Sequence, residues 1–410
     1  MEITKEQLDI VKELLKKLVS YSSYYRNKFK GLSIENINNN EDFKKIPFTT
    51  KDDINNNYPF GLKMTSQKDM VRIHSSSGST NKPIIIPYSQ TDVNDWVAML
   101  KRCYLLANVT ENDIIQITPG YGLWTAGIGF QMAAESLGAM TVPTGPGNTE
   151  RQIQFFRELK TTVLCATCSY ALFLAEEIAK QKIKDINLKK VIVGSEYCGS
   201  KMRKKICENL NVELYDIYGL TEIYGPGIGM SCKGEQGIHY WDDYLYFEII
   251  DPDTGQNVPD GKYGELVITT LKKEAYPLIR YRTHDITKIL PRSICSCGSK
   301  FPKISTILGR TDDIYKCRGV KVSINTIESI LEAIDEVTSE YLIVFDNNKG
   351  RDIMTLIVEA DHIDENYLSN HIKKCVKNKL EISPHVVIVL PGTLPRTSGK
   401  SKRIIDNRIY

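Results

Sequence analysis

The stretch from about Val71 to Val193 constrains the fold more than any other part of the chain, because helical patterns alternate there with short apolar runs. Each run is bounded by Gly, Pro or Asn, which is typical of strands in βα units of a largely parallel sheet. We therefore predict a large N-terminal α/β domain, preceded by a helical stretch with Leu8, Val11 and Leu15 at helical spacing. The predicted strands are Ile84–Ile86, Ile114–Ile117, Met140–Val142, Val163–Cys165 and Val191–Val193.

The pattern changes after residue 240. Leu245–Ile250 and Gly264–Thr270 alternate in polarity and are separated by the turn Asp251–Gly255, which predicts a small antiparallel sheet or barrel. The last part of the chain predicts a small α+β domain. Its expected helices are near Asn325–Ile334 and Glu365–Leu380, and its expected strands are Tyr341–Phe345, Met354–Glu359 and Val386–Leu390. The 410 residues suit one large domain, 1–309, and one small domain, 310–410.

Composition excludes several classes of function. The formal net charge of +3 gives no reason to expect a nucleic-acid or membrane partner. We see no apolar run of the length that a transmembrane helix needs, and the N-terminus lacks the features of a signal or transit peptide. We therefore expect a cytoplasmic protein. Most of the ten cysteines lie in apolar or helical surroundings and are expected to be reduced thiols.

A loop of small residues, His74–Pro83, lies between two short apolar runs. Its hydroxyls and backbone N–H groups can hold a polyphosphate, Gly78 permits close approach of the backbone, and Lys82 supplies a positive charge. The loop is not a Walker motif, because the pattern G-x-x-x-x-G-K-[ST] is absent. By itself such a run is more often an ordinary loop, so its interpretation depends on the rest of the chain.

Further motifs follow this loop: Tyr215–Glu222, Gly264–Leu266, Pro277–Asp285, Gly309–Asp313 and Pro395–Lys400. In this order and at these spacings they resemble the acyl-adenylate-forming superfamily, which includes acyl-CoA synthetases, peptide-synthetase adenylation domains and luciferases. The chain is more closely similar to the phenylacetate–CoA ligase family of aryl-CoA ligases. That similarity covers essentially the whole chain and is carried by Gly120–Gly127, Tyr215–Gly227, Gly237–Asp243 and Leu271–Thr283.

The resemblance implies an ATP site and the two-domain fold of adenylate-forming enzymes. Thr221 would contact the α-phosphate, and Glu222 would bind Mg²⁺, a hard ion that prefers oxygen ligands. Tyr218 would stack on adenine, and Asp216 would accept from the adenine amino group. The residues that would grip the β- and γ-phosphates are Ser76, Ser77, Gly78, Ser79, Thr80 and Lys82. The other nucleotide-binding residues would be Glu196 near adenine and Asp285 and Arg310 at the ribose.

The same resemblance makes Lys400 the candidate catalytic lysine, on a loop of a mobile C-terminal domain. It would bridge the attacking carboxylate and the α-phosphate in the adenylation transition state. Asp312 lies where this superfamily hinges, so that the small domain rotates between the two half-reactions. Taken without the motif series, Asp216 could cap a turn, Arg310–Asp313 could be a surface ion-pair cluster, and Lys400 could be a solvated tail charge.

Three positions depart from the family pattern. Asn81 stands where Gly is usual, and His284 stands where Gly or Arg is commoner. Ser195-Glu196-Tyr197 replaces the more usual Ala-Glu-Pro, which is expected to alter the adenine edge and the adjoining acid pocket.

Cys232, His239, Cys295 and Cys297 supply three thiolates and one imidazole, a ligand set that suits tetrahedral Zn²⁺. The spacing is not that of a standard zinc finger, and two loop cysteines with a surface histidine remain an alternative. Similar elements in relatives of phenylacetate–CoA ligase favour a metal. Four protein ligands leave no open coordination position, so the zinc is expected to be structural.

The acid pocket is expected to be formed by aromatic and small residues, with no obvious charged partner for a substrate amino group. An aromatic acid therefore fits better than an α-amino acid, and phenylacetate, benzoate, a hydroxybenzoate and heteroaryl acids stay open. The predicted lining residues are Tyr121, Trp124, Gly127, Ser195, Tyr197, Ile223, Tyr224 and Pro226.

CoA is the acceptor that the resemblance implies, and the basic residues Lys316, Arg318 and Lys321 could meet its phosphates. A stand-alone adenylating enzyme that loads a carrier-protein thiol would share nearly every motif and is the alternative. A third possibility is a nucleotide-sensing or scaffold protein built on a decayed ligase. That possibility predicts loss of the magnesium glutamate or of the mobile lysine, yet Glu222 and Lys400 are both present. A homodimer is the family tendency.

Overall fold

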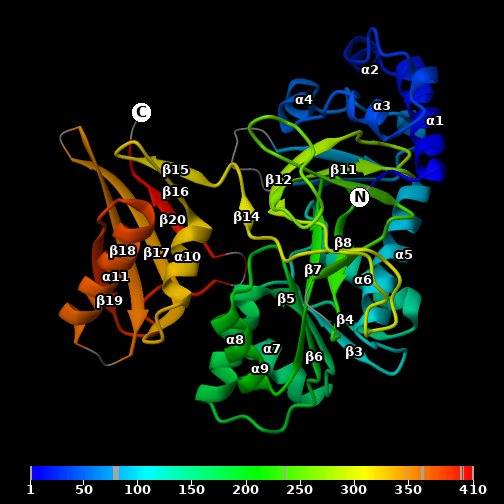
Figure 1. Cartoon of the computed structure of the whole chain (residues 1–410). Coiled ribbons are helices and arrows are strands. Elements are labelled where there is room, and N and C mark those ends of the chain that lie inside the picture. The colour runs from blue at the N-terminus through cyan, green and yellow to red at the C-terminus, as the bar shows by residue number, and fades with distance from the viewer. Residues whose placement is uncertain are drawn as a thin grey trace.

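The computed structural model describes residues 2–76, 83–234, 237–348, 350–361, 364–397, 399 and 401–408. These residues form a large N-terminal domain and a small C-terminal domain, joined by a short connection beyond β14 (Gly309–Arg310) (Figure 1). The hydrophobic cores of the two domains are separate, and the core of the small domain begins at Cys317. Within the described ranges, no helix has both the length and the apolar character needed to span a bilayer. The predicted α/β architecture with a small α+β domain is confirmed.

The large domain is built around an eight-stranded sheet among the described residues, in the order β13-β9-β8-β7-β6-β5-β3-β4. The strands from β4 to β7 run parallel, whereas β8, β9 and β13 are antiparallel to their neighbours. The strands are β3 (Ile114–Ile117), β4 (Met140–Val142), β5 (Val163–Thr167), β6 (Lys190–Gly194), β7 (Glu213–Leu220), β8 (Gly225–Ser231), β9 (Ile238–Tyr240) and β13 (Lys303–Ile304). The four predicted strands between Ile114 and Val193 are therefore confirmed.

Helices connect and cover these strands. They are α5 (Gln90–Leu106), α6 (Ala126–Leu137), α7 (Thr149–Glu158), α8 (Cys168–Lys180) and α9 (Ser200–Leu210). α5 begins with a capping box formed by Ser89 and Asp92, and the Thr167 hydroxyl caps α8. α5 packs against α6 and β8, whereas α8 packs against α9, β5 and β6.

The strand predicted at Ile84–Ile86 does not join the parallel sheet, and this prediction is corrected. It lies in β2 (Ile85–Tyr88), which pairs antiparallel with β1 (Arg72–Ser75). The connection between the two strands is too short for a parallel crossover, which takes about a dozen residues or more. The loop of small residues therefore joins the strands of a hairpin.

A second sheet of the large domain is antiparallel, as predicted, in the order β10-β11-β12-β14. Its first strands are β10 (Leu245–Ile250), β11 (Gly264–Thr270) and β12 (Tyr281–Thr287). Helices near the N-terminus pack beside it, with the rings of Phe43 and Tyr246 5.2 Å apart (Figure 1). These helices are α1 (Lys5–Tyr21), α2 (Ser23–Lys28), α3 (Asn40–Lys44) and α4 (Lys51–Asn56), with short 3₁₀ turns at Ile34–Asn36 and Gln67–Asp69.

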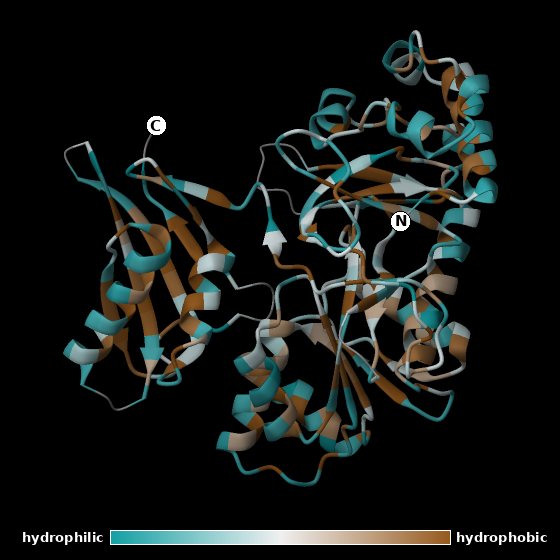
Figure 2. Ribbon diagram, in the orientation of Figure 1, coloured by the Kyte–Doolittle hydropathy of each residue, from teal (hydrophilic) through white to brown (hydrophobic). Residues whose placement is uncertain are grey.

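The small domain begins with the hairpin β15 (Ile314–Cys317) and β16 (Val320–Ser323). Its main sheet has the order β19-β18-β17-β20, from β17 (Val337–Asn348), β18 (Arg351–Ala360), β19 (His385–Val389) and β20 (Ile404–Asp406). α10 (Ile324–Glu332) and α11 (Glu365–Leu380) complete it, and the predicted bounds of the second helix are exact. Hydrophobic residues follow the strands while hydrophilic residues mark the outer helical faces (Figure 2).

Polar contacts fix the position of the small domain against the large one. The ammonium of Lys201 on α9 donates to the carbonyl oxygens of Leu331, Ile334 and Val337, which lie near the end of α10, in the turn that follows and at the start of β17. Arg396 forms ion pairs with Glu176 on α8 and Glu359 on β18. Because β14 still pairs with β12 and β15 belongs to the small domain, the chain crosses between the domains at residues 311–313.

Candidate active site

Residues from three separate motifs meet beside the end of β7. The phenol oxygen of Tyr218 donates a hydrogen bond of 2.5 Å to Oδ2 of Asp285 on β12. Oδ1 of Asp285 accepts from Arg310 at 3.0 Å, and Arg310 also binds both carboxylate oxygens of Asp312, at 2.8 and 2.9 Å. Asp285 and Arg310 are direct partners across β12 and β14, so sheet pairing fixes this network. The structure therefore brings together the residues predicted for adenine, the ribose and the hinge.

The surroundings of Asp285 oppose its negative charge. Burial raises the pKa of Asp285 to about 6, although the Arg310 cation and the Tyr218 hydrogen bond act to lower it. A shift in this direction is expected for a carboxyl group removed from water. Asp285 consequently changes protonation state in mildly acidic solution.

Thr221 and Glu222 lie in the turn between β7 and β8, close to this network. Thr221 is buried and Glu222 is partly exposed. The turn is tight, because a Cβ on Gly219 would lie 1.9 Å from the carbonyl oxygen of Gly225. Glu222 is near enough to Asp285 for its charge to raise the pKa of Asp285. The predicted magnesium ligand and the predicted ribose ligand thus face the same region.

Strands β1 and β2 flank the predicted phosphate loop in sequence, and β1 is placed by contacts with another predicted segment. Ser75 N and His74 Nδ1 both bond to the carbonyl oxygen of Leu123, at 2.8 and 3.1 Å, so β1 lies beside the segment Gly120–Gly127. Burial lowers the pKa of His74 to about 4, which favours the neutral ring with Nδ1 as donor. The Ser76 hydroxyl is buried without a partner among the described residues. The predicted phosphate ligands Ser77, Gly78, Ser79, Thr80 and Lys82, and the departure Asn81, lie outside the described residues.

Two segments predicted to line the acid pocket pack against one another. A Cβ on Gly225 would lie 2.7 Å from Cβ of Thr125, which places the chain after Glu222 directly on Gly120–Gly127. Pro226 is fixed by a 2.8 Å hydrogen bond from Trp96 to its carbonyl oxygen. Of the predicted lining residues on these two segments, Ile223, Tyr224 and Gly127 are buried, while Tyr121, Trp124 and Pro226 are partly buried. The phenol oxygens of Tyr121 and Tyr224 are buried without a partner in the described structure.

The third predicted segment, Gly194–Tyr197, leaves the end of β6. Ser195 has a φ of 68°, in the left-handed region that non-glycine residues rarely adopt. The Tyr197 side chain is 39% exposed, and a Cβ on neighbouring Gly199 would meet Glu332 of the small domain. Tyr197 therefore lies toward the domain interface, whereas Tyr224 is packed inside the large domain.

Two carboxylates predicted to bind adenine are already engaged within the protein. Glu196 accepts from the backbone N and the hydroxyl of Ser169 at 2.7 and 2.9 Å, and from Ser401 N at 3.2 Å. Asp216 pairs with Arg203 on α9. Burial raises the pKa of both carboxyl groups. A role of Glu196 and Asp216 toward adenine therefore stays a prediction.

Lys400 also lies outside the described residues, but its neighbours contact the large domain. The carbonyl oxygen of Gly399 accepts from the hydroxyl of Thr167 at 3.1 Å, while Ser401 N donates to Glu196. Both partners lie at the carboxyl ends of parallel strands, β5 and β6, where α/β folds commonly bind ligands. Gly399 and Ser401 therefore lie at the same edge of the sheet as the Tyr218 network on β7.

The predicted metal ligands converge into one cluster. The ligand atoms of Cys232, His239, Cys295 and Cys297 all lie within 4.8 Å of one another. The sulfurs of Cys232 and Cys295 are 3.5 Å apart, and Nε2 of His239 is 3.5 Å from the sulfur of Cys297. His239 Nδ1 donates to the carbonyl oxygen of Phe301 at 2.9 Å, which orients the ring so that Nε2 points toward the Cys297 thiol. The donor set and its spacing fit a tetrahedral zinc site, in which sulfurs lie about 3.8 Å apart when Zn–S bonds are about 2.3 Å.

Several residues that shape this region were not singled out from the sequence. Lys273 lies within the motif Leu271–Thr283, yet nothing in its spacing indicated that its ammonium is buried. Three other residues lie on a helix or at a strand end outside any motif, and each forms a hydrogen bond with a residue of another segment. They are Arg203, Thr167 and Lys201. Only tertiary contacts could identify them.

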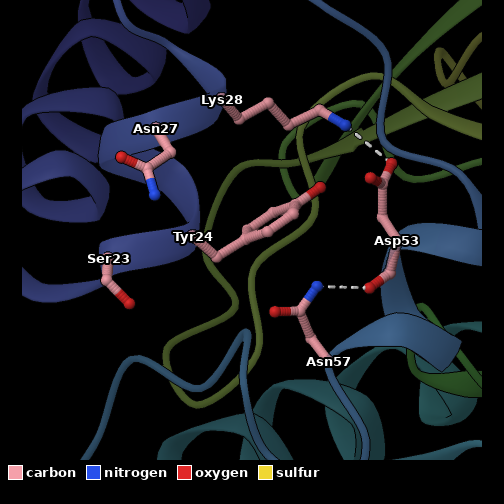
Figure 3. A pocket seen from close by; sticks show the side chains of 6 residues that line it. All are labelled: Ser23, Tyr24, Asn27, Lys28, Asp53 and Asn57. Atoms are coloured by element: carbon pink, nitrogen blue, oxygen red, sulfur yellow. Dashed lines mark hydrogen bonds and ion pairs between the residues drawn. The ribbon is translucent and has the colours of Figure 1, made fainter.

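A cavity of about 500 Å³ lies among the N-terminal helices, away from this region. Six side chains line it, from Ser23, Tyr24, Asn27, Lys28, Asp53 and Asn57 (Figure 3). Lys28 forms an ion pair of 2.6 Å with Asp53, so the charges within the cavity are mutually satisfied. The residues predicted for catalysis do not contribute to it.

Comparisons with known proteins agree with this arrangement. The AMP-binding enzyme family matches residues 5–271, and the AMP-binding enzyme C-terminal domain matches residues 319–408. A 2-hydroxyisobutyryl-CoA ligase in its postadenylation state has the same fold, with a TM-score of 0.88 at 23% identity over 98% of this chain and 89% of that chain. The same ligase in its thioesterification state gives a TM-score of 0.71 over the same shares of the two chains.

Curated relatives match over nearly their whole length. The phenylacetate–coenzyme A ligase of Pseudomonas putida is 37% identical over 99% of this chain and 94% of that protein. The phenylacetate–coenzyme A ligase of Thermus thermophilus is 36% identical over 97% of this chain and 95% of that protein. The chain is therefore a member of the phenylacetate–coenzyme A ligase family of AMP-binding enzymes.

Proposed function

We propose that this protein activates an aromatic carboxylic acid with ATP and transfers the acyl group to CoA. The observation that carries this proposal is the convergence of Tyr218, Asp285 and Arg310 with the Thr221–Glu222 turn beside the end of β7. This arrangement suits a nucleoside triphosphate, because it combines an aromatic ring, a carboxylate placed for a ribose and a partly exposed carboxylate of the kind that binds Mg²⁺. Membership of the family supports the same conclusion.

In the first half-reaction, a carboxylate oxygen of the acid attacks the α-phosphorus of ATP and pyrophosphate leaves. Ser76–Lys82 would hold the β- and γ-phosphates, and Thr221 would donate to the α-phosphate. Glu222 would hold Mg²⁺, which neutralises phosphate charge when bound. Lys400 would stabilise the charge that develops between the carboxylate and the α-phosphate. The contacts of Gly399 and Ser401 with the large domain support this placement.

In the second half-reaction, the CoA thiol attacks the acyl carbon and AMP leaves. We infer a hinge at residues 311–313, with Asp312 as its central residue and the domains at 1–309 and 310–410. Arg310 holds Asp312 by two hydrogen bonds in the present arrangement, and rotation of the small domain would release them. Lys316 and Lys321 are exposed near this hinge and would meet CoA phosphates, together with Arg318.

The predicted acid pocket favours an aromatic substrate. The Gly120–Gly127 and Ile223–Gly227 segments pack together through small residues and contribute Tyr121, Trp124 and Tyr224. The buried phenol oxygens of Tyr121 and Tyr224 lack partners in the described structure, so either could bind a polar ring substituent or the substrate carboxylate. The relatives named as phenylacetate–coenzyme A ligases support phenylacetate-like acids.

A screen for pyrophosphate release over phenylacetate, benzoate, hydroxybenzoates and heteroaryl acids tests the proposal, with a long-chain acid and an α-amino acid included. Mass detection of the acyl-CoA identifies the acceptor. An adenylate that forms without transfer to free CoA would favour the carrier-protein alternative. Lys400→Ala should abolish pyrophosphate release, whereas Lys402→Ala, an exposed lysine two residues away, should retain it.

We further propose that Cys232, His239, Cys295 and Cys297 hold a structural zinc ion. It would join the loop after β8 to the loop that precedes β13 and thereby stabilise the large domain. We also propose that the protein is cytoplasmic and forms a homodimer. Light scattering of the purified protein tests the oligomeric state, and fractionation tests the location.

A further inference from the structure

Lys273 is a buried lysine to which the proposed reaction assigns no role. Its side chain lies within the large domain, with only 2% of the residue exposed. Removing an ammonium group from water costs several kcal/mol unless partners compensate. A lysine at such a position therefore calls for a physical reason, and its contacts supply one.

The ammonium of Lys273 contacts two segments that are far apart in sequence. It donates a hydrogen bond to the carbonyl oxygen of Ile223, in the turn that carries Thr221 and Glu222. It also lies 4.7 Å from the ring centre of Tyr224 and 4.4 Å from that of Tyr88. Tyr88 is the last residue of β2, the strand that leaves the phosphate loop. One cation therefore joins the base of the phosphate-loop hairpin to the Thr221–Glu222 turn.

The backbone around Lys273 is itself fixed. The carboxylate of Asp92 accepts from Glu274 N at 2.7 Å and from Ala275 N at 3.0 Å. The same carboxylate accepts from Ser89 N, and the Ser89 hydroxyl donates to Glu274 at 2.8 Å. Ser89 directly follows β2. The loop that carries Lys273 is thus attached to the same end of the hairpin that its ammonium contacts.

The electrostatic surroundings offset the burial of the ammonium only in part. Burial lowers the pKa of Lys273 to about 7, although the charges of Asp92 and Glu222 act to raise it. The contacts of Nζ with a carbonyl oxygen and two aromatic rings leave it enclosed, so it cannot reach a bound nucleotide. Lys273 can affect the reaction only through the segments that it joins.

We propose that Lys273 is a positioning residue that sets the distance between the phosphate-loop hairpin and the Thr221–Glu222 turn. This inference rests on the proposed function, because it assumes that both segments bind ATP and Mg²⁺. If Lys273 is removed, the hairpin and the turn lose their shared contact. Because Ile223 and Tyr224 are also predicted to line the acid pocket, the diagnostic defect is weaker MgATP binding measured in the absence of the acid.

Lys273→Met is the primary test, because methionine keeps an unbranched side chain and removes the charge. Binding of MgATP to the full-length protein is measured by calorimetry, which does not require the acid to be known. We expect MgATP binding to weaken about ten-fold or more, the range that small misplacements of binding groups produce. The Mg²⁺ concentration needed for half-maximal activity should also rise.

Lys272→Met is the matched control. Lys272 is the neighbouring residue and lies 4.1 Å from the ring centre of Tyr244, but its side chain is 43% exposed. It should leave MgATP binding unchanged. Tyr88→Leu is the second variant, because it removes the contact on the hairpin side and leaves the bond from Lys273 to Ile223 in place. It should weaken MgATP binding in the same way, and it decides the question if Lys273→Met does not fold.

A folded Lys273→Met or Tyr88→Leu protein that binds MgATP with the wild-type affinity would overturn the inference. Weaker MgATP binding with a lower Tm and an unchanged Mg²⁺ requirement would mark Lys273 as a residue of general stability and would also overturn the inference. Wild-type protein that binds no MgATP would instead contradict the proposed function, so the two failures are distinguishable.

Discussion

The phenol oxygen of Tyr218 lies 2.5 Å from Oδ2 of Asp285, and this hydrogen bond joins the central sheet to the antiparallel sheet of the large domain. Arg310 binds the other oxygen of the same carboxylate. The residue proposed to stack on adenine and the residues proposed to hold the ribose are therefore one connected unit. A substitution at any of them should affect nucleotide binding more than acid binding.

Asp285→Asn should raise KM for ATP about ten-fold, because a hydrogen bond to a charged group contributes about 1.5–3 kcal/mol. In the wild type, protonation of Asp285 on lowering the pH through about 6 removes the charged acceptor, so KM for ATP should rise below pH 6 and level off above it. The variant mimics the protonated form and should lose this pH dependence. Initial rates between pH 5 and 8 provide the measurement, with the exposed Asp253→Asn as control.

Tyr218→Phe should shift the midpoint of that pH profile to a higher pH. The Tyr218 hydrogen bond lowers the pKa of Asp285, so its removal lets burial raise the pKa further. The phenyl ring keeps a surface for adenine, and KM for ATP at pH 8 should therefore change little. A midpoint that is unchanged or lower in the variant would show that the hydrogen bond does not control Asp285.

Purified protein should contain about one zinc ion per chain, since the four predicted ligands form one tetrahedral set. Cys295→Ser should lose the zinc and lower the Tm, because the metal no longer links the loops that carry its ligands. Cys375→Ser, at a half-buried cysteine outside the cluster, should retain both. Metal analysis and thermal melts give the answer, and a zinc-free wild type with the same Tm as Cys295→Ser would contradict the site.

Lys201→Met should slow acyl-adenylate formation about ten-fold, the effect of losing hydrogen bonds from a charged donor. The Lys201 ammonium donates to three carbonyl oxygens of the small domain in the present arrangement, in which Gly399 and Ser401 beside Lys400 also contact the large domain. Thioester formation from added acyl-adenylate should keep its rate. Lys204→Met, on the same helix with a 75% exposed side chain, is the control. Equal slowing of both half-reactions would reject a role specific to this arrangement.

The sequence by itself determined the elements and the kind of chemistry. The apolar runs at Ile114–Ile117 and Val191–Val193 became strands because their lengths and bounding residues match βα units, and Glu365–Leu380 became a helix with the predicted bounds. The order of the motifs indicated the family before any contact was known. Local patterns suffice for these conclusions because strand and helix periodicity is a property of neighbouring residues.

The tertiary structure decided which polar groups face one another. Asp216 pairs with Arg203, Glu196 accepts from Ser169 and Ser401, and Ile84–Ile86 belongs to a hairpin outside the parallel sheet. Lys273 is buried, and its partner Ile223 is 50 residues away while Tyr88 is farther still, so its sequence neighbourhood carried no sign of its partners. Hydrogen bonds and ion pairs act over a few ångströms in space, whatever the separation in sequence, and only the packing of the sheets brings such partners within that distance.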